Sequence, residues 1–200
     1  MAIRFQYNKT SLQEMNKQLR IRENALPILK NKEAALRIEV KKARREAEDM
    51  ERLLAEKMAQ QADMARLWEE FDPGLLGAAR VEIMARKVAG VSVPVPGEID
   101  FEQYPFSLYN RPAWFAAGIG LVKELAAIAA RKKISYRKME ILDHARRRAT
   151  QKVNLYEKVQ IPGYEDAIRK IKRFLEDEEN LAKSAQKIVK KRQQDKKQTL

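Results

Sequence analysis

The 200-residue sequence has 34% charged and only 7% aromatic residues, a composition typical of long helices and coiled coils rather than of a compact globule. Its formal net charge of +13 at pH 7 implies an acidic partner: a nucleic acid, an anionic membrane or an acidic protein cavity. The absence of cysteine excludes disulfides, thiolate metal sites and cysteine nucleophiles. The N-terminus lacks the apolar core of a signal peptide. The most apolar run, residues 113–130, contains Lys123 and Glu124 and is too short to cross a bilayer.

Apolar residues near the N-terminus recur with a spacing that alternates between three and four. The series has seventeen positions, thirteen of them apolar: Leu12, Met15, Leu19, Arg22, Leu26, Leu29, Glu33, Leu36, Val40, Ala43, Ala47, Met50, Leu54, Lys57, Gln61, Met64 and Trp68. Such a seam predicts a coiled-coil helix, on the order of 85 Å long at ~1.5 Å per residue. Thr10 or Ser11, with Glu14 downstream, is expected to cap its start. Pro27 predicts a bend in one helix or a division into two, and the unbroken phase of the seam favours the single helix.

The segment after this helix has a different composition. The helix is expected to end at residues 71–74, which include a proline and a glycine. Two runs, residues 80–89 and 91–95, alternate between apolar and polar or small side chains, which predicts a β-hairpin joined near Gly90. Prolines in the second run confine it to a sheet edge, and an open edge can accept a strand from another chain. Residues 69–111 hold seven acids and four bases, so the positive charge belongs to the flanking helices.

Large aromatic side chains gather after the second run, in a stretch without helical periodicity. They are Phe101, Tyr104, Phe106, Tyr109, Trp114 and Phe115. One interpretation is a cap that closes the open end of the helix pair, because large rings bury where geometry allows. The other is a protein-binding surface. The two interpretations are compatible.

Helical spacing returns near residue 113 and extends to the basic C-terminal segment. Its apolar positions are Leu121, Leu125, Ile128, Met139, Leu142, Ala149, Val153 and Tyr156, and then Ile168, Ile171, Leu175, Ala182, Ala185 and Val189. The second series is one residue out of phase with the first, so Pro162 and Gly163 between them mark a kink or a register change.

These patterns predict an all-α dominated fold: a long antiparallel two-helix coiled coil with a short central segment that contains a β-hairpin and an aromatic loop. We expect a single unit. It consists of an N-terminal coiled-coil arm over residues 1–70, a central hairpin and cap over residues 71–115, and a C-terminal coiled-coil arm over residues 116–200.

No residue pattern points to catalysis, to a cofactor or to a metal. His144 is the only histidine, so a histidine-rich metal site is excluded and a place on a helix surface is expected. Residues 118–120, Gly-Ile-Gly, lack the further glycine and the preceding strand of a dinucleotide fingerprint. The four acids of residues 176–179 point in different directions on a helix, as expected of a solvated or ion-paired face. The three arginines of residues 146–148 allow a nucleic-acid interpretation, but zinc ligands and a helix-turn-helix pattern are missing.

The C-terminal arm carries a motif at Val153-Asn154, Leu155, Glu157, Ile161-Pro162, Glu165, Ile168, Ile171, Leu175 and Glu178. In this motif the chain resembles the C-terminal helix of the D subunit of V-type and A-type rotary ATPases. The N-terminal arm is similar to the same family at Asn8-Lys9, Leu12, Leu19 and Leu29-Lys30-x-Lys32. The middle matches in plan, with a strand, then Gly90-Val91-x-Val93-Pro94, then an aromatic loop. Pro27 and the long middle segment rich in aromatics and prolines depart from the family's pattern.

The resemblance implies a non-catalytic rotor subunit without a cofactor. Such a subunit is the central shaft, with both termini inside a ring of nucleotide-binding A and B subunits and its middle toward the membrane. The F subunit binds beside it, and a C/d-type subunit couples it to the membrane rotor, so that rotation links ATP hydrolysis or synthesis to ion transport. The implied location is cytoplasmic and peripheral to the membrane, with no nucleic acid bound and no direct insertion.

Two groups of contact residues are expected. The shaft ends are expected to contact the catalytic ring through Asn8, Lys9, Lys187, Lys190, Lys191 and Arg192. The edge strand is expected to pair with the F subunit at Val91, Val93 and Val95. The residues alone leave two other classes of protein open: a free-standing coiled-coil adaptor that clasps acidic partners, and a basic nucleic-acid-binding rod. Steeply salt-dependent binding to duplex DNA would favour the rod.

Overall fold

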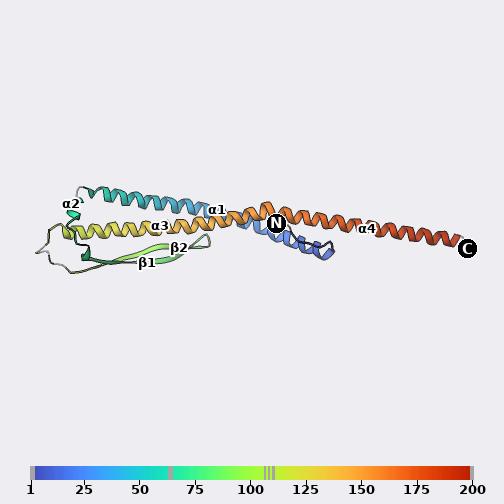
Figure 1. Ribbon diagram of the computed structural model, residues 1–200, viewed down its shortest axis with the longest axis horizontal. Coiled ribbons are helices and arrows are strands. Elements are labelled where there is room, and N and C mark those ends of the chain that lie inside the picture. The colour runs from blue at the N-terminus through green and yellow to red at the C-terminus, as the bar shows by residue number, and fades with distance from the viewer. Residues whose placement is uncertain (1–2, 63–64, 106, 108, 110, 199–200) are drawn as a thin grey trace. The chain divides into compact units, whose positions relative to one another are not determined.

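The computed structural model describes residues 3–62, 65–105, 107, 109 and 111–198. Its elements are α1 (Lys9–Ala59), α2 (Ala65–Trp68), a 3-10 turn (Pro73–Leu75), β1 (Leu76–Val88), β2 (Val91–Gln103), α3 (Phe115–Leu155), a π turn (Tyr156–Gln160) and α4 (Ile161–Gln198) (Figure 1). The chain divides into two compact units, Met1–Asn31 with Ala149–Leu200, and Lys32–Arg148. Long paired helices with a central β-hairpin confirm the predicted fold class. The predicted division into two arms and a central segment stays a prediction.

In the first unit, the start of α1 packs against α4. Met15 lies against Ile168 and Ile171, and these three side chains are 9%, 7% and 0% exposed. Leu12, Leu19 and Leu175 surround this cluster. All of these are positions of the predicted seams, so the apolar spacing correctly identified the faces that pair.

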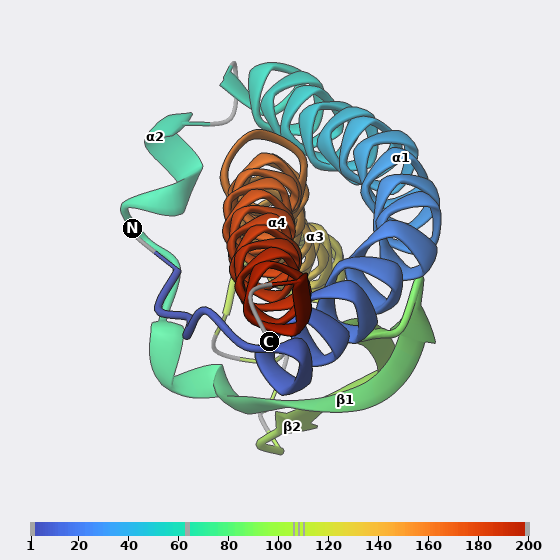
Figure 2. The same cartoon turned by 90° about the vertical axis from the view of Figure 1, so that its right-hand side faces the viewer.

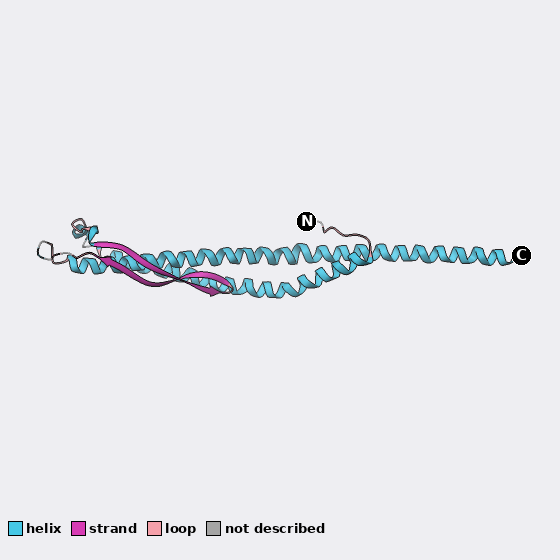
Figure 3. Cartoon of the chain, turned by 90° about the horizontal axis from the view of Figure 1, so that it is seen from below, coloured by secondary structure: helices cyan, strands magenta, loops and turns pink. Residues whose placement is uncertain are grey.

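The residues before α1, numbers 3–7, fold back onto the first unit, and we call them the N-terminal strap (Figure 3). Ile3 packs on the apolar cluster, and the ring of Tyr7 lies 4.8 Å from the ring of Phe174. Gly163 makes room for the strap, because a Cβ at this position would lie 3.0 Å from Cδ1 of Ile3. The glycine is therefore explained by a close approach rather than by the end of a helix.

Helix α1 begins at a capping asparagine. The backbone N–H of Ser11 donates to Oδ1 of Asn8 at 2.6 Å, which satisfies a first-turn amide. The expected cap at Thr10 or Ser11 was wrong, because α1 already begins at Lys9 and the capping side chain is that of the preceding residue, Asn8. Pro27 lies inside one uninterrupted helix, which confirms the continuous alternative. Every described position of the N-terminal seam is buried or half-buried, and Met64 lies outside the described residues.

In the second unit, α1 and α3 run antiparallel side by side (Figure 1), and the hairpin lies along α3 with its turn close to α1, where a Cβ at Gly90 would lie 3.7 Å from Nζ of Lys32 (Figure 2). Three ion pairs between α1 and α3 show that the two helices are antiparallel. They are Lys57–Glu124, Glu51–Lys132 and Glu46–Lys138, with N···O distances of 2.8, 2.7 and 2.6 Å. The core is formed by Leu36, Ala43, Ala47, Ile128, Ile134 and Leu142, none more than 7% exposed. The two alanines are almost fully buried, as expected where two helices approach closely.

Strands β1 and β2 form a two-stranded antiparallel sheet. Val88 pairs with Val91, and the two residues between them, Ala89 and Gly90, have φ values of 49° and 77°. Two consecutive positive φ values are the pattern of a type I′ hairpin turn. The predicted hairpin is confirmed, but β2 continues through its prolines and takes in residues 100–103, which we had expected in the loop. Both strands of a two-stranded sheet are edges, and an edge tolerates proline.

An aromatic cluster closes one end of the second unit. Trp68, Phe71, Trp114 and Phe115 have ring centroids 4.9–6.0 Å apart in contacting pairs. Phe115 is 2% exposed and shares a core with Leu75 and Ile119. Helix α1 ends at Ala59, well before the expected end at residues 71–74, because the chain turns to bring Trp68 into this cluster. Of the six rings expected to form the cap, only Trp114 and Phe115 lie in this cluster. Tyr104 and Tyr109 are 47% and 96% exposed, Phe101 is half-buried on β2, and Phe106 lies outside the described residues.

The predicted phase change in the C-terminal arm is a π turn. The backbone N–H of Ile161 donates to the carbonyl of Tyr156, and this i→i+5 bond accommodates one extra residue without ending the helix. Pro162 explains why the π turn lies at this point of the helix. In a regular α-helix the proline ring would crowd the carbonyl of Lys158, and the wider turn relieves that crowding. The expected alternatives were a kink and a register change, and the structure contains the register change.

Candidate interaction surfaces

The described residues hold no cluster of three or more histidine, cysteine or acidic side chains suited to a metal ion. None of the described helices has an apolar stretch long enough to cross a membrane. His144 is exposed on α3, as expected. Gly118 packs against the indole of Trp114 and so belongs to the aromatic cap. Two surface features of the described residues can be compared with the expected contacts.

The C-terminal part of α4, residues 176–194, forms the first surface, which we call the basic tail. Every side chain in it is exposed, including the apolar Leu181, Ile188 and Val189 at 72%, 56% and 53%. Residues 180–194 contain five bases and no acid. The expected seam positions Ala182, Ala185 and Val189 are all exposed, and of the three only Ala182 lines a groove with the start of α1, beside Lys9 and Leu12.

The start of α1 lies beside Glu179 of α4, because Lys9 and Leu12 line one groove with Glu179 and Ala182. A hydrogen bond from Lys183 lowers the pKa of Glu179, and the charge of Lys9 lowers it further. Lys9 therefore lies near Glu179, whereas residues 187–192 lie 8–13 residues farther along α4, roughly 12–20 Å at ~1.5 Å per residue.

The expected shaft-end contacts are thus separated into two patches. Asn8 and Lys9 form one, at the start of α1, and the side chain of Asn8 is already engaged in capping. The other patch is Lys187, Lys190, Lys191 and Arg192, all exposed on the basic tail.

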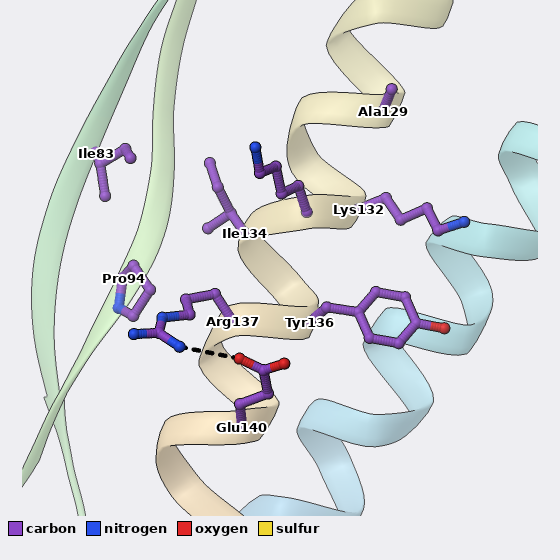
Figure 4. A pocket seen from close by; sticks show the side chains of 9 residues that line it. Ile83, Pro94, Ala129, Lys132, Ile134, Tyr136, Arg137 and Glu140 are labelled. Atoms are coloured by element: carbon purple, nitrogen blue, oxygen red, sulfur yellow. Dashed lines mark hydrogen bonds and ion pairs between the residues drawn. The ribbon is translucent and has the colours of Figure 1, made fainter.

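A groove between the hairpin and α3, with a volume of about 670 Å³, forms the second surface, which we call the hairpin groove. Its lining is Ile83, Pro94, Ala129, Lys132, Lys133, Ile134, Tyr136, Arg137 and Glu140. Figure 4 shows Ile83 and Pro94 on the strand side and Ile134 and Arg137 directed toward them from α3. Arg137 binds Glu140 at 3.0 Å. The groove therefore combines an apolar interior with a mostly cationic rim.

Two lining residues, Lys132 and Tyr136, point toward α1 instead (Figure 4). Both bind Glu51: the Lys132 Nζ donates to Oε1 at 2.7 Å and the Tyr136 hydroxyl donates to Oε2 at 2.6 Å. These bonds lower the pKa of Glu51, with the Lys132 bond the largest cause, and the carboxylate raises the pKa of Tyr136. Lys133 and Arg137 thus supply the positive charge of the groove. No pattern in the sequence pointed to this site, since pairing between helices is needed to bring Glu51 to α3.

The three valines expected to meet the F subunit lie on β2. Val93 is 1% exposed, and Val91 and Val95 are half-buried, so strand pairing there would use the backbone rather than these side chains. The exposed apolar side chains are instead on β1, where Ile83 and Met84 are 60% and 53% exposed. Two adjacent apolar residues break the alternation of a half-buried strand, and that was the sequence signal we missed.

Fold and surfaces together define a helical protein built for contact with other proteins: antiparallel helices, a docked hairpin, and an exposed basic tail. Comparison with known families agrees, because the model of the ATP synthase D-subunit family matches residues 11–191. The chain belongs to this family and is thereby a subunit of a multisubunit ATPase.

Three relatives illustrate the similarity. The D subunit of the V-type ATP synthase of Chlamydia abortus is 29% identical over 181 residues, covering 88% of this chain and 87% of the relative. That of Chlamydia muridarum is 29% identical over 200 residues, covering 96% and 97%. That of Borreliella burgdorferi is 34% identical over 103 residues, covering 52% and 51%.

Proposed function

We propose that the chain is the central shaft of a V/A-type rotary ATPase and transmits rotation between a nucleotide-hydrolysing ring and a membrane rotor. It does no chemistry itself. Its partners are the A and B subunits of the ring, a small F subunit, and a C/d-type subunit that links it to the membrane ring. The proposed location is cytoplasmic, peripheral to the membrane. Family membership supports a place in the complex, and the surfaces support a place on its axis.

The observation that carries this proposal is the basic tail. Nineteen consecutive side chains of one helix are exposed, and three large apolar side chains among them have nothing to cover them within their unit. Exposed apolar side chains on a charged helix indicate a surface that is buried in a complex. Residues 180–194 of this tail carry five bases and no acid, and such a stretch of a single helix suits a narrow passage whose walls are acidic. The ring of A and B subunits is the proposed passage.

A single off-centre helix in a threefold ring cannot contact three subunits alike. Each subunit would then experience a different set of contacts, and turning the shaft would bias each nucleotide site in succession. Linkage requires the converse, so that nucleotide binding and hydrolysis bias the angle of the shaft. Energy transfer needs no reactive group on the chain.

For the F subunit we propose the hairpin and its groove. The backbone of β2 at Val91, Val93 and Val95 remains the proposed pairing edge. The adjoining groove, with Ile83 on one side and Lys133 and Arg137 on the rim, would take apolar and acidic side chains of the same partner. A test is co-purification of the F subunit with Ile83→Asp, against Ile38→Asp as a matched control, because Ile38 is similarly exposed at 57% on α1. Equal recovery of the F subunit with both variants would contradict this placement.

The shaft role is tested by rotation. The chain, carrying a fluorescent label on its basic tail, is assembled with A, B and F subunits whose ring is fixed to a surface. ATP is expected to drive rotation of the label in one direction. A label that stays still while the complex hydrolyses ATP would overturn the proposal.

The role of tail charge is tested separately. Replacing Lys187, Lys190, Lys191 and Arg192 together by Gln is expected to weaken assembly with the ring and to reduce its salt dependence. The control replaces four exposed bases elsewhere by Gln, namely Lys17, Arg20, Lys41 and Arg45. If both variants assemble equally well, the tail charge is not the contact.

A further inference from the structure

Both helices of the first unit have a backbone irregularity at the same level. Two contacts align them: Lys30 Nζ binds Glu157 Oε1 at 2.6 Å, and Arg22 Nε donates to Gln160 Oε1 at 2.8 Å. Pro27 lies between these positions of α1, so a helix residue without an N–H is opposite the π turn (Tyr156–Gln160). Each irregularity removes regular i→i+4 hydrogen bonds from its own helix. Their coincidence leaves neither helix regular at this level.

Buried side chains are also missing here. No described side chain of residues 16–35 or of residues 143–166 is buried, whereas Met15 and Leu36 are buried on either side along α1, and Leu142 and Ala167 are buried on either side along α3 and α4. The boundaries between the two compact units, after Asn31 and before Ala149, fall within the same segments. Few buried contacts together with missing backbone bonds mark a region of low local stability.

A polar contact occupies the seam where apolar packing is missing. Arg22 stands at a seam position of α1, and its guanidinium lies 4.5 Å from the ring centroid of Tyr164 while bonding to Gln160. It also donates to the Gln18 carbonyl at 2.9 Å. One side chain thus links α1 to the last residue of the π turn and to the first turn of α4.

We propose that residues 22–31 of α1 and residues 149–164 of the opposite helix form a joint in the helix pair, latched by Arg22. The joint is the place where the pair opens and twists before the apolar segments on either side do. The latch is broken and remade as one unit, because the hydrogen bond and the ring contact share a guanidinium. In a rotating shaft the joint would let one end lag behind the other; that consequence rests on the proposed function, whereas the joint itself does not.

Amide hydrogen exchange of the isolated full-length chain tests the joint. Amides of residues 156–164 are expected to exchange at least about tenfold faster than those of residues 36–47 and 167–175, because opening at the joint exposes fewer buried side chains. Equal exchange in all three regions would overturn the proposal. Rotation is not needed for this result, so the joint and the shaft role fail separately.

Deleting Lys158 removes the extra residue and brings the two apolar series into phase. The deletion is expected to restore a regular helix and to slow exchange over residues 156–164 by about tenfold. The control deletes Arg173, an exposed residue in a regular part of α4, and should leave exchange at residues 156–164 unchanged. Slowing by both deletions, or by neither in folded chains, would contradict a joint made by the π turn.

A point variant keeps the test valid if the deletion fails to fold. Arg22→Ala releases the latch and is expected to speed exchange over residues 156–164 about tenfold, with no effect at residues 36–47. Arg20→Ala removes an exposed arginine and is the matched control. No difference between the two variants would show that Arg22 does not hold the joint.

Discussion

The Arg22 guanidinium donates to the Gln160 side chain at 2.8 Å, across 138 positions of sequence, and joins the seam of α1 to the end of the π turn. A charged residue on an apolar seam ordinarily lowers stability and sets register. Here the π turn displaces the opposite helix by one residue, and the arginine reaches the polar side chain that this displacement presents. The phase change therefore places the polar side chain of Gln160 opposite Arg22, which accounts for a charged residue at this seam position.

A double-mutant cycle measures this relationship. Arg22→Ala is expected to lower the free energy of unfolding by about 1–2 kcal/mol, because a hydrogen bond and a cation–π contact are lost together. Arg22→Ala and Gln160→Ala should be non-additive by about 0.5–1.5 kcal/mol, as expected for residues in contact. Denaturant unfolding of the two single variants and the double variant gives the coupling. Strict additivity would mean that the bond contributes nothing in solution.

The spacing of apolar residues and the turn residues correctly predicted the local features of the fold. Seam faces on both arms, the continuity of α1 through Pro27 and the hairpin turn at Gly90 follow from local rules, since each depends on residues within a few positions. The phase change at Pro162 was also visible, but its hydrogen-bond pattern was not, because a kink and an inserted residue give the same shift in apolar spacing.

Features that depend on the register between helices could not be predicted. Nothing in the spacing says that α1 starts opposite Glu179, so the exposure of Val189 and the separation of Lys9 from Lys187 came only from the structure. The hairpin groove likewise requires knowledge of which face of α3 receives β2. Repeating heptads pair equally well in several registers, and ion pairs such as Lys138–Glu46 choose among them.

Removing a core side chain tests where stability resides. Leu142 is 0% exposed, so Leu142→Ala is expected to cost about 2–5 kcal/mol of unfolding free energy through lost burial and a cavity. Ile38 is 57% exposed, and Ile38→Ala should change stability by less than about 0.5 kcal/mol. Chemical denaturation followed by circular dichroism compares them. A similar small loss for both would mean that the second unit lacks the tight core seen here.

We expect replacement by alanine to have opposite effects on stability at two glycines, Gly90 and Gly120. Gly90 has a φ of 77°, which alanine adopts poorly, so Gly90→Ala should destabilise by about 1–2 kcal/mol. Gly120 lies in α3 with no atom within 4 Å of an added Cβ, so Gly120→Ala should stabilise by about 0.5–1 kcal/mol. Thermal melts of the two variants are the measurement. Shifts of melting temperature in the same direction would contradict either the turn or the open helix position.

Glu51 predicts a dependence of stability on pH. Hydrogen bonds from Lys132 and Tyr136 lower the pKa of Glu51, so the folded state favours the charged carboxylate. Its contribution is fully present above the pKa of the unfolded chain, which is near 4.3 for glutamate, and is lost as pH falls through the lower folded pKa. The wild type should therefore exceed Glu51→Gln in free energy of unfolding at neutral pH, and this difference should narrow below about pH 4.

Urea unfolding of the wild type and of Glu51→Gln from pH 7 to pH 3 measures this gap in free energy of unfolding. Glu56→Gln, at an exposed position of α1, is the matched control. A gap for Glu51→Gln that stays constant with pH would exclude an ionised carboxylate between the two donors.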